Sequence, residues 1–218
     1  MNVILFGCTG MVGQGVLREC LLDPSVQHVL SILRSSTGQQ HAKLTKLVFK
    51  GFFDLLLNRI SSRLRRLFFL RGPSSSGMSE ESYSQVIYDM NLAAAHTLVR
   101  LNPTTTFTYV SGAGTDSTEQ RRTMGAGVKG KTGNALLRLP CKAAHVLRPA
   151  GIQPLHGIRS RTASYRILYT IAKPVFALLK LLLPNYITTT EQFGRAMIHV
   201  AQNGFPKPIL EARDSDQA

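Results

Sequence analysis

The strongest constraint on the fold lies at the start of the chain, where residues 3–13 read VILFGCTGMVG. Val3 to Phe6 form an apolar run that is long enough for a buried strand and too short for a helix. Glycines follow at Gly7, Gly10 and Gly13. A strand, a glycine turn and a helix in this order are typical of a dinucleotide-binding unit, whose glycines make the turn, let the backbone approach a pyrophosphate and let the helix pack on the strand. A glycine-rich turn with no ligand is the alternative interpretation.

The second expected strand, His28 to Leu33, ends directly before Arg34. In dinucleotide-binding folds a residue near this place, about 20 residues after the glycine loop, contacts the adenosine ribose. An acidic residue there favours the free 2′-hydroxyl of NAD, whereas Arg34, followed by Ser35 and Ser36, favours the 2′-phosphate of NADP. The sequence therefore predicts NADP as cofactor, with NAD as the less favoured choice and a solvated arginine as the alternative without a ligand.

The composition is that of a globular protein without a metal centre. Of the 218 residues, 44% are hydrophobic and 17% are charged, which argues against disorder. Cys8, Cys20 and Cys141 are an odd number of cysteines without CxxC spacing, and the histidines are scattered. These features argue against a disulfide framework and against a zinc site. Because no secretory leader is evident, we expect a cytoplasmic protein.

The net charge of +14 raises the question of a polyanionic partner. The excess is patchy, with one group of basic residues in 59–71 and another in 121–148. The chain has no Trp, and these basic stretches lack the interleaved aromatic side chains that stack on bases. Nucleic acid is therefore a disfavoured partner.

Strands and helices alternate along the chain, which predicts a Rossmann-like α/β fold, a doubly wound parallel sheet with helices on both faces. The further expected strands are residues 44–49, 67–70, 106–110 and 143–147. The expected helices are residues 80–101, 124–137 and 191–203, with Ser79 and Thr190 capping the first and the last. The apolar face of the first of these helices is expected to consist of Val86, Met90, Ala93, Ala94, Thr97 and Leu98.

Two polar residues follow expected strands. Ser111 comes directly after the strand 106–110 and begins a second glycine loop, SGAG. Because open α/β sheets bind ligands at the carboxyl ends of their strands, Ser111 is a candidate ligand contact, with a structural turn serine as the alternative. Asp54 follows the strand 44–49, where it would meet the adenine amino group or simply cap the next helix.

Residues 166–183 form a strongly apolar stretch that Lys173, Pro174 and Lys180 interrupt. The stretch is therefore a poor membrane-spanning helix. We expect a helical lid or a subunit contact there, with peripheral membrane contact as the alternative.

The chain is expected to form one domain over residues 1–213, with residues 150–205 as its substrate or lid region and a disordered tail at 214–218. The long helix 80–101 offers a face on which a homodimer could form.

Four stretches together resemble one family. They are LFGCTGMVG at residues 5–13, TFTYVSGAGTDS at 106–117, VKGKT at 128–132 and LRPAGIQPLHGIRSRT at 147–162. In these stretches the chain resembles the atypical short-chain dehydrogenase/reductases, which are NAD(P)-binding proteins of the NAD-dependent epimerase/dehydratase type. It is particularly similar to the small bacterial relatives of the human Tat-interacting oxidoreductase-like protein, and the resemblance covers nearly the whole chain.

The resemblance implies a Rossmann domain that binds NADP and transfers a hydride to or from a small carbonyl or alcohol substrate. It places the pyrophosphate against Gly7, Thr9, Gly10, Met11, Val12 and Gly13. It also implies that Arg34 meets the adenosine phosphate, that Gly72 lies beside the cofactor, and that Pro149 lies beside the nicotinamide. Ser111 matches the serine that hydrogen-bonds a substrate carbonyl. Lys129 matches the lysine that holds the nicotinamide ribose and lowers the pKa of the catalytic tyrosine.

The chain departs from this family at the catalytic tyrosine, because Gly125 stands four residues before Lys129. Hydride transfer to a carbonyl needs a proton donor for the developing alkoxide, and glycine has none to give. Tyr109 is the nearest substitute in sequence, whereas Tyr83 and Tyr88 lie on another expected helix. Two functions therefore stay open, an oxidoreductase and a non-catalytic NADP-binding sensor or regulatory protein.

Residues 55–71 form a second departure, since the family resemblance implies an acidic or neutral helix there. This stretch instead contains Arg59, Arg63, Arg65, Arg66 and Arg71. We interpret it as a local reading-frame disturbance or a divergent, basic amphipathic segment, and peptide mass mapping of the expressed protein distinguishes the two. A genuine segment would alter the third and fourth strands and hence the adenine pocket.

Overall fold

The computed structural model describes residues 1–35, 37–48, 66–70, 75, 77–120, 123–159 and 186–216. Asp54 and Gly72, two of the predicted cofactor contacts, lie outside these residues. Most of the basic segment 55–71 and the whole apolar stretch 166–183 also lie outside them, so the predictions made there stay predictions. Within the described part of the chain, no helix is both long enough and apolar enough to cross a membrane.

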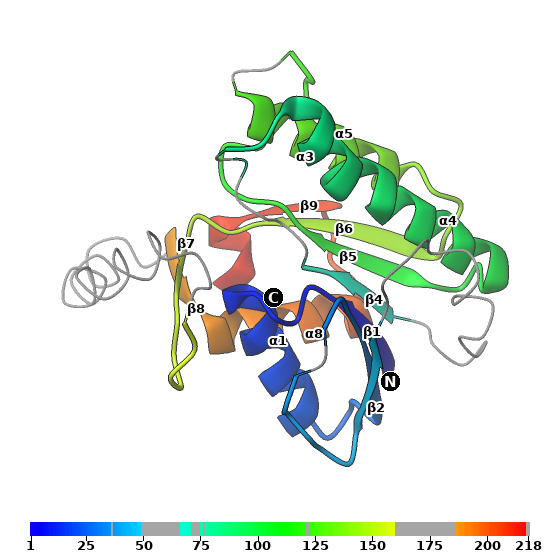
Figure 1. Cartoon of the computed structure of the whole chain (residues 1–218), viewed down its shortest axis with the longest axis vertical. Helices are drawn as coiled ribbons and strands as arrows, with labels where there is room; N and C mark the ends of the chain where they lie inside the picture. The colour runs from blue at the N-terminus through cyan, green and yellow to red at the C-terminus, as the bar shows by residue number, and fades with distance from the viewer. Residues whose placement is uncertain are drawn as a thin grey trace.

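Among the described residues, seven parallel strands form one sheet in the order β3-β2-β1-β4-β5-β6-β9 (Figure 1). The strands are β1 (Asn2–Phe6), β2 (His28–Leu33), β3 (Leu44–Val48), β4 (Arg66–Phe69), β5 (Thr106–Val110), β6 (Ala143–Arg148) and β9 (Ile209–Glu211). The order reverses between β1 and β4, and open α/β sheets bind ligands at the carboxyl ends of the strands at such a reversal. This topology confirms the predicted doubly wound, Rossmann-like fold.

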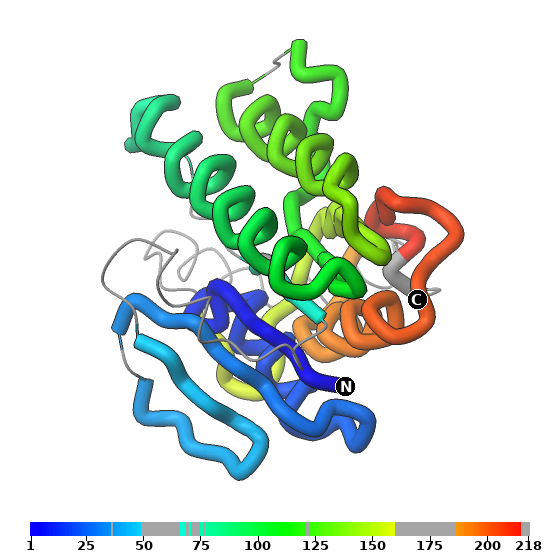
Figure 2. Tube along the Cα trace, turned by 90° about the vertical axis from the view of Figure 1, so that its right-hand side faces the viewer, coloured from blue at the N-terminus to red at the C-terminus, as the bar shows by residue number. Residues whose placement is uncertain are grey.

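The apolar run at the start of the chain is buried on both faces of this sheet. The covering helices are α1 (Met11–Leu22) and α8 (Thr190–Asn203) on one face and α4 (Met90–Leu101) and α5 (Met124–Leu137) on the other (Figures 1 and 2). Val3 and Leu5 pack in the core on the α1 and α8 side. Ile4 and Phe6 pack in the core on the α4 and α5 side. A strand covered on both faces needs an unbroken apolar run, because successive side chains point to opposite faces.

The predicted helix 80–101 is divided by a π-helical turn. Its parts are α3 (Glu80–Ser84), the π-turn η1 (Gln85–Asp89) and α4. Ser79 is the N-cap, as predicted, since its Oγ accepts a hydrogen bond from the Ser82 amide at 3.2 Å. The helix α5 has the predicted bounds, and its own cap is Thr123.

For the helix predicted at residues 80–101, part of the predicted apolar face is wrong. Val86 and Met90 are only half-buried and Ala93 is exposed. Ala94, Thr97 and Leu98 are buried as predicted, and the other buried side chains of the helix are Tyr83, Ile87, Asn91, Ala95 and Val99. A π-turn holds more residues than an α-turn, so it rotates the preceding residues by about one position relative to α4.

Two short parallel strands, β7 (Gly151–Gln153) and β8 (Ile187–Thr189), pair beside the main sheet and are not predicted by the sequence. The helix α8 follows β8 and begins one residue earlier than predicted. Thr189 rather than Thr190 is its N-cap, because the Thr189 Oγ1 accepts a hydrogen bond from the Gln192 amide at 3.0 Å.

The start of the tail differs from the expected disorder. Residues Ala212–Asp216 form a 3-10 helix, η3, that follows β9. Asp214 is buried in it, where its carboxylate accepts a hydrogen bond from the Glu211 amide at 3.0 Å and pairs with Lys207 at 3.2 Å. These contacts fasten the chain to the edge of the sheet through Asp214.

The helices α1 and α8 meet almost backbone to backbone. A Cβ added at Gly15 would lie 2.6 Å from the Thr190 Cβ and 2.9 Å from the Thr190 carbonyl oxygen. A Cβ added at Gly194 would lie 2.7 Å from the Glu19 Cγ. Real Cβ atoms essentially never approach other atoms so closely, so the two glycines set the separation of these helices.

We expect Gly15→Ala to destabilise the protein, because the new methyl group must push α8 away from α1. Overpacking of this kind lowers the free energy of unfolding by roughly 1–3 kcal/mol, which exceeds the gain in helix propensity of up to about 1 kcal/mol. Urea denaturation followed by circular dichroism measures the change. The matched control is Gly38→Ala, since a Cβ there meets no atom within 4 Å. Equal midpoints for the two variants would contradict the packing described.

Candidate functional site

The glycine loop joins β1 to α1 at the carboxyl edge of the sheet. Gly7 has a φ of +82°, a left-handed conformation that favours glycine, and its carbonyl accepts a hydrogen bond from the Gly10 amide at 3.1 Å. A Cβ added at Gly13 would lie only 2.1 Å from the Gly7 carbonyl oxygen. The helix therefore starts against the end of the strand, and it does so because residue 13 has no side chain.

The N-terminus of α1 has the properties of an anion site. Gly10 is the N-cap and has no side chain with which to cap the helix, and the first turn contains no acidic residue. The amide groups of Met11 and Val12 belong to this first turn, where the positive end of the helix dipole lies. Thr9 completes the loop, and its carbonyl accepts a hydrogen bond from the Gln14 side-chain amide at 3.2 Å. The loop thus fits a bound phosphate group.

Arg34 lies at the same edge of the sheet, directly after β2, which is the parallel neighbour of β1. Its side chain is exposed and makes no hydrogen bond or ion pair with any described residue. The loop after it is held by Lys46, whose ammonium donates to the Thr37 carbonyl at 2.7 Å and to the Gln39 carbonyl at 2.8 Å. Arg34 is therefore a free cation on an anchored loop.

Ser111, Lys129 and Pro149 come together where β5 and β6 end. The Ser111 amide donates to the Leu147 carbonyl at 2.9 Å, and the Ser111 Oγ makes a longer hydrogen bond of 3.4 Å to the same oxygen. The Ala113 amide donates to the carbonyl of the buried Pro149 at 2.9 Å, which ties the SGAG loop to the end of β6.

Lys129 reaches this loop from α5. Its Nζ lies 3.9 Å from the position that a Cβ at Gly112 would take. The ammonium makes no hydrogen bond or ion pair within the described residues, and burial lowers its pKa from the ordinary value of 10.5. A half-buried cation without a counter-charge is stabilised by any ligand that offers it oxygen atoms.

Gly125 lies one turn before Lys129 on α5, and Ser75 lies against it. A Cβ added at Gly125 would be 3.0 Å from the Ser75 Oγ and 3.4 Å from the Ser75 Cβ. The Ser75 side chain thus lies where a side chain of residue 125 would begin. Sequence reasoning did not single out Ser75, because it belongs to a run of serines in which no member stands out.

The three tyrosines considered as substitutes for the missing one, Tyr109, Tyr83 and Tyr88, each make other contacts. Tyr109 is 1% exposed and packs in the core beneath α4 and α5, where burial raises its pKa. Tyr83 is equally buried beside Ile87 and Val128, and its pKa is raised to about 12. Tyr88 lies under the ammonium of Lys131, 4.6 Å from the ring centroid to the Nζ. Tyr109, the nearest substitute in sequence, is therefore a core residue.

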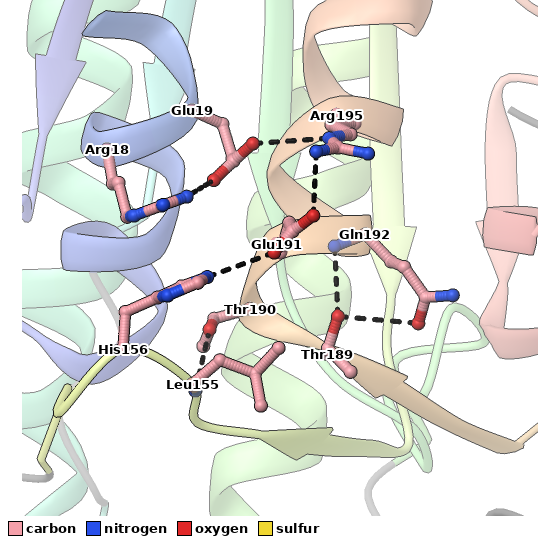
Figure 3. Close-up of polar contacts among 9 residues, drawn as sticks. All are labelled: Arg18, Glu19, Leu155, His156, Thr189, Thr190, Glu191, Gln192 and Arg195. Atoms are coloured by element: carbon pink, nitrogen blue, oxygen red, sulfur yellow. Dashed lines mark hydrogen bonds and ion pairs between the residues drawn. The ribbon is translucent and has the colours of Figure 1, made fainter. Parts of the chain in front are cut away.

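A row of charged side chains, also missed by sequence reasoning, connects α1 to the turn after β7 (Figure 3). On α1, the 4% exposed Glu19 pairs with Arg18 and, at 3.3 Å, with Arg195 of α8. Arg195 pairs in turn with Glu191 at 2.6 Å, and the second oxygen of Glu191 lies 2.9 Å from the His156 Nε2. Charged residues of these types are common on protein surfaces, so no local sequence pattern predicts that they contact one another.

No protein-family model matches this chain, and no curated protein matches it by sequence. Solved structures do match it over nearly its whole length. The enzyme WbmF of Bordetella bronchiseptica, solved in complex with NAD+, is 13% identical with a TM-score of 0.67, over 99% of this chain and 76% of that chain. An oxidoreductase of the short-chain dehydrogenase/reductase family from Burkholderia thailandensis is 14% identical with a TM-score of 0.66, over 99% and 92%.

A short chain dehydrogenase family protein from Francisella tularensis is 14% identical with a TM-score of 0.64, over 96% of both chains. At such low identities the likeness shows the fold and not the activity. The strand order and these matches confirm the structural resemblance that the motifs predicted. The chain has a Rossmann-like fold that is similar to the fold of the short-chain dehydrogenase/reductases.

Proposed function

We propose that the protein is an NADP-binding oxidoreductase of the short-chain dehydrogenase/reductase type, acting on a small carbonyl or alcohol compound. The observation that carries this proposal is the loop from Gly7 to Gly13, which brings an uncapped helix N-terminus to the reversal point of the sheet. Backbone amides and a helix dipole in this place suit a pyrophosphate. WbmF, which shares the fold, was solved with NAD+, and this supports a dinucleotide in the same place.

Arg34 supports NADP over NAD. Its exposed guanidinium stands at the end of β2, where a carboxylate would instead accept a hydrogen bond from the ribose 2′-hydroxyl. A planar guanidinium pairs with a phosphate through two charge-assisted hydrogen bonds. The 2′-phosphate of NADP offers such a group and NAD does not.

In this proposal Ser111 orients the substrate carbonyl and Lys129 holds the nicotinamide ribose, with Pro149 beside the nicotinamide. Bound NADPH supplies the hydride. The 3.4 Å hydrogen bond of the Ser111 Oγ is long, so the hydroxyl is easily turned toward a substrate oxygen. The unpaired ammonium of Lys129 stabilises ribose hydroxyls and the negative charge that develops nearby.

We expect Arg34→Ala to weaken NADPH binding roughly tenfold or more, because it removes charge-assisted hydrogen bonds worth about 1.5–3 kcal/mol. NADH binding should change little, since NADH has no 2′-phosphate. Nicotinamide fluorescence during a titration measures both affinities. Arg100→Ala is the matched control, because Arg100 is an exposed arginine in the last turn of α4. Equal loss for both nucleotides would contradict the assignment of Arg34, and no binding by folded wild-type protein would contradict the proposed cofactor.

The second candidate function is a non-catalytic NADP-binding sensor or regulatory protein. The observation that favours it is Gly125, which leaves the site without the family's proton donor. The burial of Tyr83 and Tyr109 adds to this, since neither hydroxyl is placed to replace the donor. Nucleotide binding and catalysis are thus separate questions for this chain.

The double variant Gly125→Tyr with Ser75→Gly distinguishes the two functions. Restoring a proton donor should raise NADPH oxidation with a panel of small aldehydes and ketones by roughly a hundredfold if the rest of the site is competent. Gly125→Tyr alone should gain less, because the new side chain must displace the Ser75 hydroxyl. The matched control is Gly125→Phe with Ser75→Gly, which has the same bulk and no acidic proton. Equal rates for the tyrosine and phenylalanine variants would favour the sensor.

A further inference from the structure

The turn that follows β7 has a backbone conformation that needs outside support. His156 has a φ of +56°, in the left-handed region that residues with side chains rarely adopt, and Gly157 follows with a φ of +73°. Such conformations persist only where surrounding contacts hold them, and they gather at functional sites. The turn Leu155–Gly157 begins six residues after Pro149, which the proposed function places beside the nicotinamide.

Two contacts from the first turn of α8 supply this support. The Thr190 Oγ1 accepts a hydrogen bond from the Leu155 amide at 3.1 Å. The Glu191 carboxylate lies 2.9 Å from the His156 Nε2 (Figure 3). The backbone amide of Leu155 and the side chain of His156 are therefore bound to Thr190 and Glu191, two adjacent residues of α8.

The same two residues of α8 are fastened to α1. Thr190 packs on Gly15 so tightly that a Cβ at residue 15 would lie 2.6 Å from the Thr190 Cβ. Glu191 pairs with Arg195, which pairs with the buried Glu19. Because α1 begins at the glycine loop, one unbroken set of contacts runs from the nucleotide helix to the turn.

Charged groups surround the contact between His156 and Glu191. The groups that face His156 directly or through Glu191 are the Glu191 carboxylate, Arg195, Arg18 and, beyond Arg195, Glu19. The hydrogen bond from His156, together with the two arginines, holds the pKa of Glu191 below its usual value. The contact with His156 is therefore made by an ionised carboxylate, and such charge-assisted hydrogen bonds are the stronger ones.

We propose that Glu191 is a positioning residue of the proposed site, which locks the Leu155–Gly157 turn onto the nucleotide helix α1. The link from the lock to the nucleotide rests on the proposed function. The lock itself rests only on the contacts of α1, α8 and the turn, so the two parts are tested separately.

Hydrogen exchange of the peptide 151–159, measured by mass spectrometry without nucleotide, tests the lock. Protection factors should be roughly two- to fivefold lower in Glu191→Gln and in His156→Gln than in the wild type, because each variant removes one partner of the contact that holds the turn. The matched control, His199→Gln, removes an exposed histidine from the same helix and should behave as the wild type. Equal protection factors in all four proteins would overturn the lock.

Calorimetric titration with NADP+ tests the link to the nucleotide. Glu191→Gln should bind NADP+ roughly two- to fivefold more weakly than the wild type. Equal affinities of the two proteins would overturn the positioning role. Absence of binding by the wild type would overturn the proposed function and the link, whereas the exchange experiment would still decide the lock.

Discussion

The close approach of the Gly7 carbonyl to Gly13 fixes the position of α1 and of the elements that pack on it. Only an absent Cβ lets α1 begin so near the end of β1, since a methyl group at residue 13 would lie 2.1 Å from the carbonyl oxygen. Through Gly15, α1 packs on Thr190 of α8, and Thr190 accepts the hydrogen bond that holds the Leu155–Gly157 turn. The position of this turn thus depends on a series of contacts that starts at one backbone oxygen.

Close packing and ion pairing depend on each other between these helices. Gly194 brings α8 so near that Glu19 is left 4% exposed, and an unpaired carboxylate at that depth would be strongly destabilising. Arg18 and Arg195 remove this penalty by pairing with both carboxylate oxygens. The glycine creates the burial and the arginines make it tolerable. Replacing both arginines would leave an uncompensated buried charge, which is worse for stability than never having had the pairs.

Sequence reasoning found the elements whose pattern is local. An apolar run covered on both faces, a β-branched strand before Ser111 and a serine cap at Ser79 each leave a signature within a few residues. It failed where a contact joins residues far apart in the sequence or where a structural feature spans only a few residues. The π-turn Gln85–Asp89 shifts a buried face without any residue that marks it, and Glu19 meets Arg195 across 176 positions of the chain. The place of Ser75 against Gly125 likewise depends on two elements that only the fold brings together.

The two halves of the site rest on different elements and are therefore separable. The half that the proposed function assigns to the nucleotide depends on β1, β2 and α1. It keeps the glycine turn, the uncapped helix and an Arg34 that has no partner in the described part of the chain. The proton-donor half depends on α5, where Lys129 is kept but Gly125 offers no hydroxyl. A loss on α5 does not disturb the packing of α1, because the two helices lie on opposite faces of the sheet (Figure 1). Under the proposed function, nucleotide binding therefore does not require the proton donor on α5, and the enzyme and the sensor differ in α5 alone and not in the fold.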